Sequence, residues 1–363
     1  MTNEMWSGLL FYAAIAAVTA AFADLSVRRS SKPLNIFFTI LAILTPSLFA
    51  GLRYGIGTDY SNYLEGFFEI NSPIFDVDTE YLFLGINKIV GYLGLDFQFV
   101  LFITSFITTL FIYLALKRYK ASLNIGIGMF VYMMMYYQIS FNAIQQIAAM
   151  AILLFSIHYI NERKFIKFTL LVVIAVGFHE TAILFYPLYF LHFLYGTSKH
   201  TLLKVLSFSG LIVLMINFSA VLFPIASSID SLSYYANSYL DSDREFELGL
   251  GILFRTLPFI IAGIIFRKDI KSNKDMIFIF NVVIIGCISL LTSYGSVNFT
   301  ERISYYFLSS LIIFVPFIYR LSAIKKKRYI GFLVIFSVIG LWFMDFIYLG
   351  RNETIPYEWI LNN

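Results

Sequence analysis

The residues whose chemistry stands out are six basic side chains set apart from the other Lys and Arg residues of the chain. Most Lys and Arg residues lie in short connections on one side of a series of apolar segments, whereas six lie toward the opposite side: Arg53, Lys88, Arg244, Arg255, Arg302 and Arg351. Five of the six are arginine, whose planar guanidinium grips a phosphate through two parallel hydrogen bonds. Their types and placement therefore predict an anion site at one face of a membrane.

The first of these arginines begins a glycine-rich string, residues 53–63, which reads RYGIGTDYSNY. The two glycines permit tight turns and a close approach of the backbone to a ligand. Arg53 and Asp59 would then share a small space with three tyrosines. The alternative is a structural loop in which Arg53 pairs with Asp59. The string is not a nucleotide-binding P-loop, because no Gly-Lys-Ser or Gly-Lys-Thr follows the glycines.

A histidine and a glutamate, His179 and Glu180, lie between two short apolar arms, residues 165–178 and 181–195. Basic residues precede the first arm (Arg163, Lys164) and follow the second (Lys199, Lys204). If both groups lie on the same side of the membrane, the chain must enter it and return. With the rise of an α-helix each arm reaches about 21–23 Å, less than the hydrocarbon thickness of about 30 Å. The pair should therefore lie recessed, lining a cavity or paired within the protein. His is the commonest general base near neutral pH; the alternative is a structural histidine.

Two further arginines lie within or at the end of apolar segments. Arg255 follows the apolar string GLGILF, at a depth where an unpaired charge is expensive. Arg302 follows the string NFTE at the start of another segment. It either extends to the membrane interface or binds phosphate. Both belong to the predicted anion site.

Amides and carboxylates supply other candidates. Gln145 and Gln146, in the string NAIQQ, either hydrogen-bond sugar hydroxyls or cap a helix. Asp76 and Asp78, in an outer loop, either hold a metal or act as a base, or form a solvated acidic loop. The one cysteine, Cys287, lies in an apolar segment, so an intrachain disulfide and a site with two Cys ligands are excluded.

The elements that must position these residues are membrane-spanning helices. Of the 363 residues 59% are hydrophobic and 13% charged, whereas a soluble domain is about 25% charged. A span needs about 20 apolar residues, and the sequence predicts an all-α polytopic membrane protein of about twelve transmembrane helices in a single domain, residues 1–363. The predicted spans are 6–23, 34–52, 97–116, 122–140, 143–160, 165–178, 181–195, 205–223, 250–266, 276–293, 303–319 and 329–349.

The distribution of Lys and Arg also predicts the topology. The basic connections are assigned to the cytoplasm, where Lys and Arg accumulate. Both termini and the larger loops, near 53–96, 224–249 and 294–302, then lie outside, and residues 80–95 form an amphipathic helix on the outer surface. The formal net charge of +4 is explained by the cytoplasmic connections, so it gives no reason to expect nucleic acid.

Three strings carry a resemblance to a known family. The strings GLRYGIGTDYSNY, FNAIQQIAAMAILLFSIHYI and KFIKFTLLVVIAVGFHETAILFYPLYFL, which span roughly residues 50–195, resemble the EpsG family of polysaccharide polymerases. That family is close to the Wzy-type O-antigen and capsular polysaccharide polymerases. One departure is that the family usually has Arg-Gln where this chain has Gln145-Gln146.

The resemblance implies a glycosyltransferase of the bacterial cytoplasmic (inner) membrane, with its active site facing the periplasm or the cell exterior. A polysaccharide chain on undecaprenyl diphosphate is transferred to the sugar of a new lipid-linked repeat unit, and undecaprenyl diphosphate leaves. The implied chemistry needs no cofactor and no metal, because arginines stabilise the charge of the leaving diphosphate. The implied partners are undecaprenyl-diphosphate-linked glycans, the bilayer, and a chain-length regulator and flippase of the same pathway.

The resemblance also assigns roles to the candidate residues. His179 is the catalytic base, oriented by Glu180 or Asp59, and Asp59 is the second choice for the base. The residues assigned to the diphosphate are Arg53, Arg255, Arg302 and Arg244. The residues assigned to the sugars are Tyr60, Gln145, Gln146 and Glu301.

Three alternatives remain open. A transferase that takes one sugar from a polyprenyl phosphate would use Asp76 or Asp78 with a divalent metal. An O-antigen ligase shares the lipid-linked donor and the need for Arg and His, but it typically has a larger outer loop than residues 224–249. A lipid-linked oligosaccharide flippase needs polar residues that reach both faces, whereas the charges within these segments crowd the outer half.

Overall fold

A computed structural model describes residues 2–28, 31–73, 79–197, 199–216, 250–292 and 298–360. This part of the chain is helical, and its only β feature is an isolated bridge between Arg53 and Trp359. The longer helices are α1 (Asn3–Arg28), α2 (Lys32–Gly51), α3 (Tyr60–Ile70), α4 (Tyr81–Tyr92), α5 (Phe97–Arg118), α6 (Ile125–Met135), α7 (Ile144–Asn161), α8 (Phe165–Phe178), α11 (Thr201–Ile216), α14 (Leu250–Ile265), α16 (Lys274–Thr292), α17 (Asn298–Leu308), α18 (Leu311–Ile324) and α19 (Arg328–Trp342). The shorter ones are η1 (Ile139–Phe141), η2 (Glu180–Phe185), α9 (Pro187–Phe190), α10 (His192–Tyr195), α15 (Arg267–Ser272), η4 (Phe343–Tyr348) and η5 (Arg351–Glu353).

The helices fit a multi-pass membrane protein, but the predicted count of about twelve spans is not confirmed. Among the described residues six helices are long and apolar enough to cross a membrane: α1, α2, α5, α7, α16, and α19 with η4. The pair α17 and α18, bent by 46°, would make a seventh span if counted as one. Other predicted spans correspond to shorter apolar helices, such as α6 and α8.

The predicted span over 181–195 is replaced by three short helices, η2, α9 and α10. Its backbone leaves the helical region at His179, where φ is −160° and ψ is 119°. Pro187 then begins α9, because proline has no backbone N–H to continue the preceding turn. The recessed turn predicted at His179 is therefore followed by a segmented return rather than by one straight helix.

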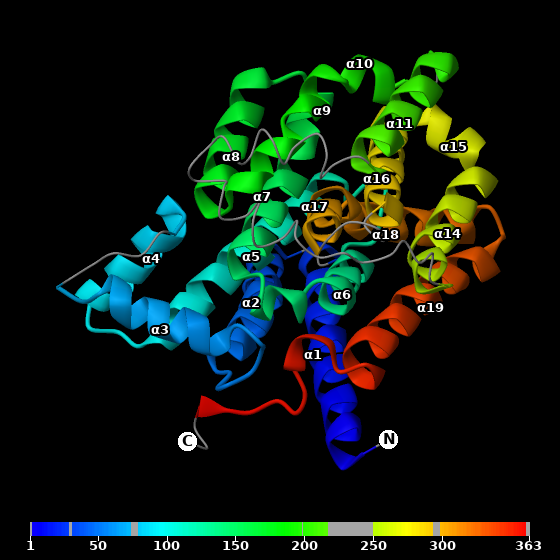
Figure 1. Ribbon diagram of the computed structural model, residues 1–363. Helices are drawn as coiled ribbons and strands as arrows, with labels where there is room; N and C mark the ends of the chain where they lie inside the picture. Colours follow the sequence, from blue (N-terminus) through cyan, green and yellow to red (C-terminus); the bar gives the residue numbers. More distant parts are fainter. Residues whose placement is uncertain are drawn as a thin grey trace.

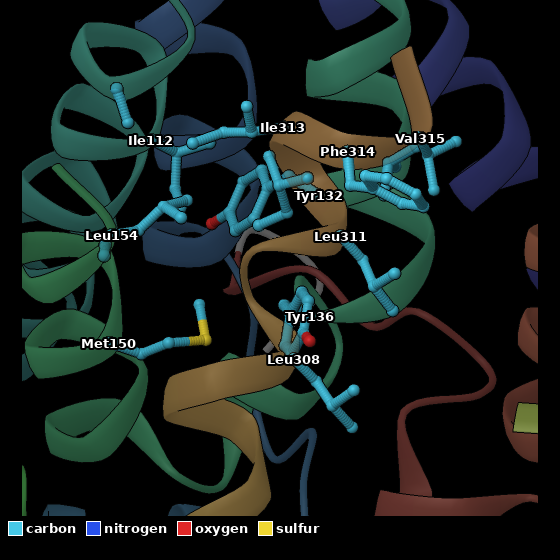
Figure 2. Close-up of a cluster of buried hydrophobic side chains, with 14 of the residues drawn as sticks. Ile112, Tyr132, Tyr136, Met150, Leu154, Leu308, Leu311, Ile313, Phe314 and Val315 are labelled. Carbon is cyan, nitrogen blue, oxygen red and sulfur yellow. The ribbon is translucent and has the colours of Figure 1, made fainter. Parts of the chain in front are cut away.

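The core is built around α7, which lies in the middle of the bundle (Figure 1). This helix is apolar around its whole circumference and largely buried, as expected for a helix enclosed by others. It packs against α5, α8, α16 and α17. Figure 2 shows side chains from α5, α6, α7 and the α17–α18 pair meeting in one cluster, with Met150 and Leu154 contributed by α7.

Helices α3 and α4 project to one side of the bundle (Figure 1). Helix α4 falls within the predicted amphipathic segment 80–95 and buries Phe83, Asn87 and Val90 along one face. Tyr81 and Tyr92, at its two ends, are strongly exposed. Because α4 packs against α5 and α8, its first residues are brought close to the end of α8.

The C-terminal segment, residues 350–360, folds back over the loop that follows α2 (red in Figure 1). Backbone hydrogen bonds join Tyr54 N to Glu358 O (3.1 Å), Ile360 N to Leu52 O (2.9 Å) and Gly57 N to Glu353 O (3.1 Å). This pairing satisfies polar backbone groups of an irregular loop, which would otherwise be costly to bury. The C-terminal segment and the loop after α2 therefore meet in the fold.

Candidate functional site

His179 is bonded to a glutamate that lies far from it in the sequence. Its Nδ1 is 2.6 Å from Glu80 Oε1, and the two side chains are 14% and 11% exposed. His179 is the last residue before η2, and Glu80 is the residue that immediately precedes α4. Glu80 occupies a helix-capping position but makes no capping bond. Its carboxylate is directed to the histidine instead.

The second oxygen of the same carboxylate is also occupied. Gln145, in the first turn of α7, donates from Nε2 to Glu80 Oε2 at 2.8 Å and to Thr79 Oγ1 at 3.0 Å. A carboxylate that accepts two well-aligned bonds is fixed in orientation. Thr79, Glu80, Gln145 and His179, which we call the His179 cluster, thus join α4, α7 and η2.

The His179 cluster determines which ring nitrogen can react. An ionised carboxylate only accepts hydrogen bonds, so Nδ1 carries the proton and Nε2 is an acceptor in the neutral ring. Within the described part of the chain, no hydrogen bond engages Nε2 of His179. This is the arrangement in which a carboxylate orients a histidine that takes a proton from a substrate hydroxyl.

The structure orients His179 through Glu80, whereas the predicted partners were Glu180 and Asp59. Glu180 is exposed, because the extended backbone at His179 sends consecutive side chains in opposite directions. Asp59 is half-buried at the start of α3, and Thr58 Oγ1 donates to its Oδ1 at 3.4 Å. The roles of Glu180 and Asp59 in the reaction stay predictions.

Arg53 lies inside the protein and bonds to the backbone. It is 1% exposed, its Nη2 donates to Phe141 O at 3.0 Å, and its guanidinium carbon lies 4.2 Å from the centre of the Phe141 ring. No ion pair joins it to Asp59 among the described residues. Burial lowers the pKa of Arg53 to about 10, so it remains charged at neutral pH.

The space beside Arg53 is small. The adjoining cavity, next to Thr104, Ser105 and Ser140, has a volume of about 10 Å³. A single water needs roughly 10–15 Å³, so a diphosphate does not fit there in this conformation. The predicted binding of diphosphate by Arg53 therefore lacks a ligand-sized space in this structure.

The glycine-rich loop is fixed to the start of the α7 region through Asn142. The amide N of Asp59 donates to Asn142 Oδ1 at 3.2 Å, and Tyr63 Oη donates to Asn142 O at 2.7 Å. Gly57 has φ of +103°, and a Cβ there would lie 2.5 Å from Asn142 Oδ1. Only glycine fits this position without strain. The loop thus positions the helix that carries Gln145.

Gln146 connects the His179 cluster to Arg302. Neighbouring helix residues point about 100° apart, so Gln146 faces away from Glu80 and donates to the backbone O of Arg302 at 2.9 Å. Gln146 is almost fully buried. Tyr63 interacts electrostatically with both Glu80 and Arg302. Arg302 therefore lies on the side of α17 that adjoins the His179 cluster.

Arg255 is paired with a carboxylate from the other end of the chain. Its Nη2 bonds to Asp345 Oδ1, and Arg351 Nη1 lies 3.6 Å from the same oxygen. Arg255 is on α14, Asp345 on η4, and Arg351 begins η5. Tyr305 on α17 interacts electrostatically with Arg255, Arg302 and Arg351. The predicted cost of a charge at Arg255 is offset by this pairing.

The remaining predicted residues lie in different places. Tyr60 is buried against Phe97, and its hydroxyl accepts from Gln98 Nε2 at 3.1 Å. Glu301 lines a cavity that Arg255 also lines. Arg244, Asp76 and Asp78 lie outside the described residues. The structure thus brings together His179, Gln145, Gln146 and Arg302, and separately Arg255 and Glu301.

The sequence analysis did not single out Glu80 or Asp345, and it did not predict the pairing of Arg351 with Asp345. Glu80 follows Thr79 just before an apolar helix, a position that is typical of a helix start. Asp345 is a single carboxylate inside an apolar segment, the signal that had singled out Arg255. Both carboxylates could have been proposed as partners, but the pairing itself depends on the tertiary fold.

One protein-family model matches nearly the whole chain. The model of the family described as the EpsG family matches residues 35–359, which include every candidate site residue and the C-terminal segment that closes over the glycine-rich loop. The match confirms and extends the resemblance, which the sequence strings supported over roughly residues 50–195. No curated protein and no solved structure matches the chain.

Proposed function

The chain belongs to the EpsG family, and from that premise we propose that it is a glycosyltransferase that polymerises a surface polysaccharide. Family membership supports a polysaccharide polymerase-like role. The proposed substrates are undecaprenyl-diphosphate-linked oligosaccharide repeat units, and the proposed site of reaction is the outer face of the cytoplasmic membrane. Undecaprenyl diphosphate is the proposed leaving group.

The observation that carries the proposal is the bond between Glu80 and His179. Joining two sugars requires removal of a proton from the attacking hydroxyl. His179, oriented by Glu80 and with no hydrogen bond to Nε2 from the part of the chain that the structure describes, supplies that function. A polar dyad that is mostly shielded from water, at the junction of three helices, also suits proton transfer better than an exposed histidine.

In the proposed step a sugar hydroxyl of one lipid-linked unit displaces the diphosphate of the other. The acceptor hydroxyl gives its proton to His179 Nε2 while its oxygen bonds to the anomeric carbon of the donor sugar. The bond between that carbon and the diphosphate oxygen breaks, and the electron pair leaves with the diphosphate. The Glu80 carboxylate stabilises the imidazolium that forms. Arg302 and Arg255 are the proposed stabilisers of the leaving charge.

Sugar binding is assigned to groups around the same cluster. Gln145 and Gln146 hold Glu80 and the Arg302 backbone, so we assign them to the support of the site as well as to hydroxyl binding. Glu301 lines the same cavity as Arg255. We propose that its carboxylate accepts hydrogen bonds from hydroxyl groups of the donor sugar. Tyr60, which is buried, acts by supporting α3.

The experiment that tests the proposal compares surface polysaccharide from a strain lacking the gene with that from the complemented strain. A polymerase defect leaves the acceptor carrying a single repeat unit and removes the ladder of longer products. Complementation with the wild-type chain restores the ladder, and complementation with His192→Ala, a histidine on α10 away from the His179 cluster, does the same.

Three results would contradict the proposal. An unchanged ladder in the deletion strain would show that polymerisation does not depend on this chain. A complete absence of repeat units at the surface would place the chain at an earlier transfer or at lipid flipping. If only the final attachment of a finished polymer were lost, the chain would be a ligase.

A further inference from the structure

A large cavity lies between α14 and α19 with η4, helices that lie side by side (Figure 1). Its volume is about 590 Å³. One end is lined by charged groups, Arg255, Asp345, Arg351 and Glu301. Apart from Ser337, the rest of the lining is apolar and includes Phe254, Leu333, Phe336, Leu341 and Met344. The cavity is therefore amphiphilic, and its charges come from three places in the chain, Arg255 on α14, Glu301 on α17 and residues 345–351.

The apolar lining opens onto the outer surface of the helix bundle. Phe254 is 67% exposed and Phe336 is 71% exposed. Both belong to apolar helices of a chain that fits a multi-pass membrane protein. In a bilayer such a surface faces acyl chains, because transfer of exposed apolar side chains from water to an apolar environment is favourable. A ligand could thus enter this cavity sideways from the lipid.

The charged end holds two guanidinium groups on one carboxylate. Arg255 and Arg351 both pair with the same oxygen of Asp345. A diphosphate offers several oxygens, so each guanidinium can bond to oxygens of its own, whereas here the two share one carboxylate oxygen. Asp345 therefore acts as an internal anion that neutralises the arginines when the cavity holds no phosphate.

We propose that this cavity binds the diphosphate and the first isoprene units of an isoprenoid lipid, with the diphosphate displacing Asp345 from Arg255 and Arg351. The proposal rests on the proposed function for the identity of the lipid carrier. It adds the place of binding, assigns Arg351 and Asp345 to it, and assigns the apolar walls of α14 and α19 to the hydrocarbon chain.

Gly340 gives a direct test of the cavity. It lines the cavity on α19, and a Cβ added there meets no atom within 4 Å. A Gly340→Phe side chain can therefore occupy the space of the lipid without a backbone clash. Gly210 on α11 is the matched control, because a Cβ there also meets nothing within 4 Å and the residue is not part of the cavity lining.

The experiment is a titration of the purified full chain in detergent with geranylgeranyl diphosphate, read by native mass spectrometry or calorimetry. We expect Gly340→Phe to raise the dissociation constant by about tenfold or more, since it removes apolar contacts. Gly210→Phe should leave it unchanged. Asp345→Asn should lower it by about tenfold, because the arginines lose their competing anion.

Three ligand controls separate the sources of binding energy. Geranylgeraniol, which lacks the charge, and inorganic diphosphate, which lacks the chain, should each bind at least about tenfold more weakly than the amphiphile. Phosphatidylglycerol should not compete at equal concentration. Effective competition by phosphatidylglycerol would mean an ordinary phospholipid site and would overturn the inference.

Equal binding of geranylgeranyl diphosphate by the Gly340→Phe, Gly210→Phe and wild-type chains would also overturn the cavity inference. This test holds even if Asp345→Asn does not fold. The outcome is separable from the proposed function. If Gly340→Phe weakens binding while the deletion strain still makes long polysaccharide, the cavity inference stands and the polymerase proposal fails. If the deletion strain loses its ladder but Gly340→Phe supports a normal one and binds normally, the polymerase proposal stands and the cavity inference fails.

Discussion

The His179 cluster and the glycine-rich loop after α2 both gather polar side chains, but those side chains bind different partners. In the cluster His179, Glu80 and Gln145 bind one another and leave Nε2 of the histidine open among the described residues. Arg53 in the loop, and Asn142, which holds the loop from the start of the α7 region, bind mainly backbone groups. Polar side chains that bind backbone groups therefore hold the fold together. The Glu80–His179 pair instead keeps one ring nitrogen available for proton transfer.

Among the residues that hold or surround His179, the largest expected effect is at Glu80. Glu80→Gln keeps an oxygen that can accept from His179 but removes the charge that stabilises the imidazolium. We expect the rate of polymerisation at saturating substrate to fall about 100-fold, or about 2.7 kcal/mol, with little change in KM. Glu180→Gln, the neighbour of His179 in sequence, should be close to wild type in the same assay. Equal losses in the two variants, or a loss confined to KM, would contradict the assignment of Glu80.

Arg53→Lys tests the opposite region. Lys cannot stack its plane on Phe141 and is more strongly hydrated than Arg, so burying it in place of Arg53 should cost about 2 kcal/mol of stability. A lower melting temperature in detergent would show this. Arg320→Lys is the matched control, because Arg320 also donates to backbone carbonyls but is exposed. Unchanged melting of Arg53→Lys together with lost activity would move Arg53 from the fold to the chemistry.

Arg255→Lys should lower the rate of polymerisation, as changes in the His179 cluster do, rather than the melting temperature, as changes in the loop do. Lys keeps the charge that pairs with Asp345, but it cannot grip a diphosphate through two parallel bonds. We expect about a tenfold loss in polymerisation rate, or about 1.4 kcal/mol, and a melting temperature near that of the wild type. If the variant instead melts much earlier and the surviving protein is fully active, Arg255 serves the fold.

The smallest expected effects are at position 145, where Gln145 faces Glu80 Oε2. Gln145→Leu leaves that oxygen without its partner and should slow polymerisation about threefold to tenfold. Gln145→Arg should remain close to wild type, because a guanidinium there donates to the same carboxylate. Either Arg or Gln at position 145 could then donate to the Glu80 carboxylate, which would account for the Gln145-Gln146 pair in place of Arg-Gln. The two variants are compared by the length distribution of the product, and a stronger loss in Gln145→Arg than in Gln145→Leu would contradict the contact.

Much of the helical architecture follows from the sequence, and the site follows from it only in part. Apolar length predicts α1, α2, α5, α7, α16 and α19, because each long run must be buried or face lipid. It does not predict how a short apolar run such as 181–195 divides, since Pro187 and the extended backbone at His179 decide that locally.

Residue type and depth correctly drew attention to His179 and Arg255, but their partners could not be predicted. Glu80 and Asp345 come from segments 99 and 90 residues away along the chain, and nothing local distinguishes them from other acids. Adjacency in sequence favoured Glu180, whereas the extended backbone at His179 directs it elsewhere. The role of residues 350–360 in holding the loop also depends on tertiary backbone pairing, for which the sequence carries no periodic signal.

The most direct test of the central claim is the product made by the purified chain from lipid-linked repeat units, with His179→Ala beside the wild type. We expect the wild-type chain to form a ladder of products. His179→Ala should bind the lipid-linked unit but form almost no linkage, a loss of about 100-fold or more for a missing base. His192→Ala should form the normal ladder. A full ladder from His179→Ala would contradict the account, because the oriented histidine would then not be the base.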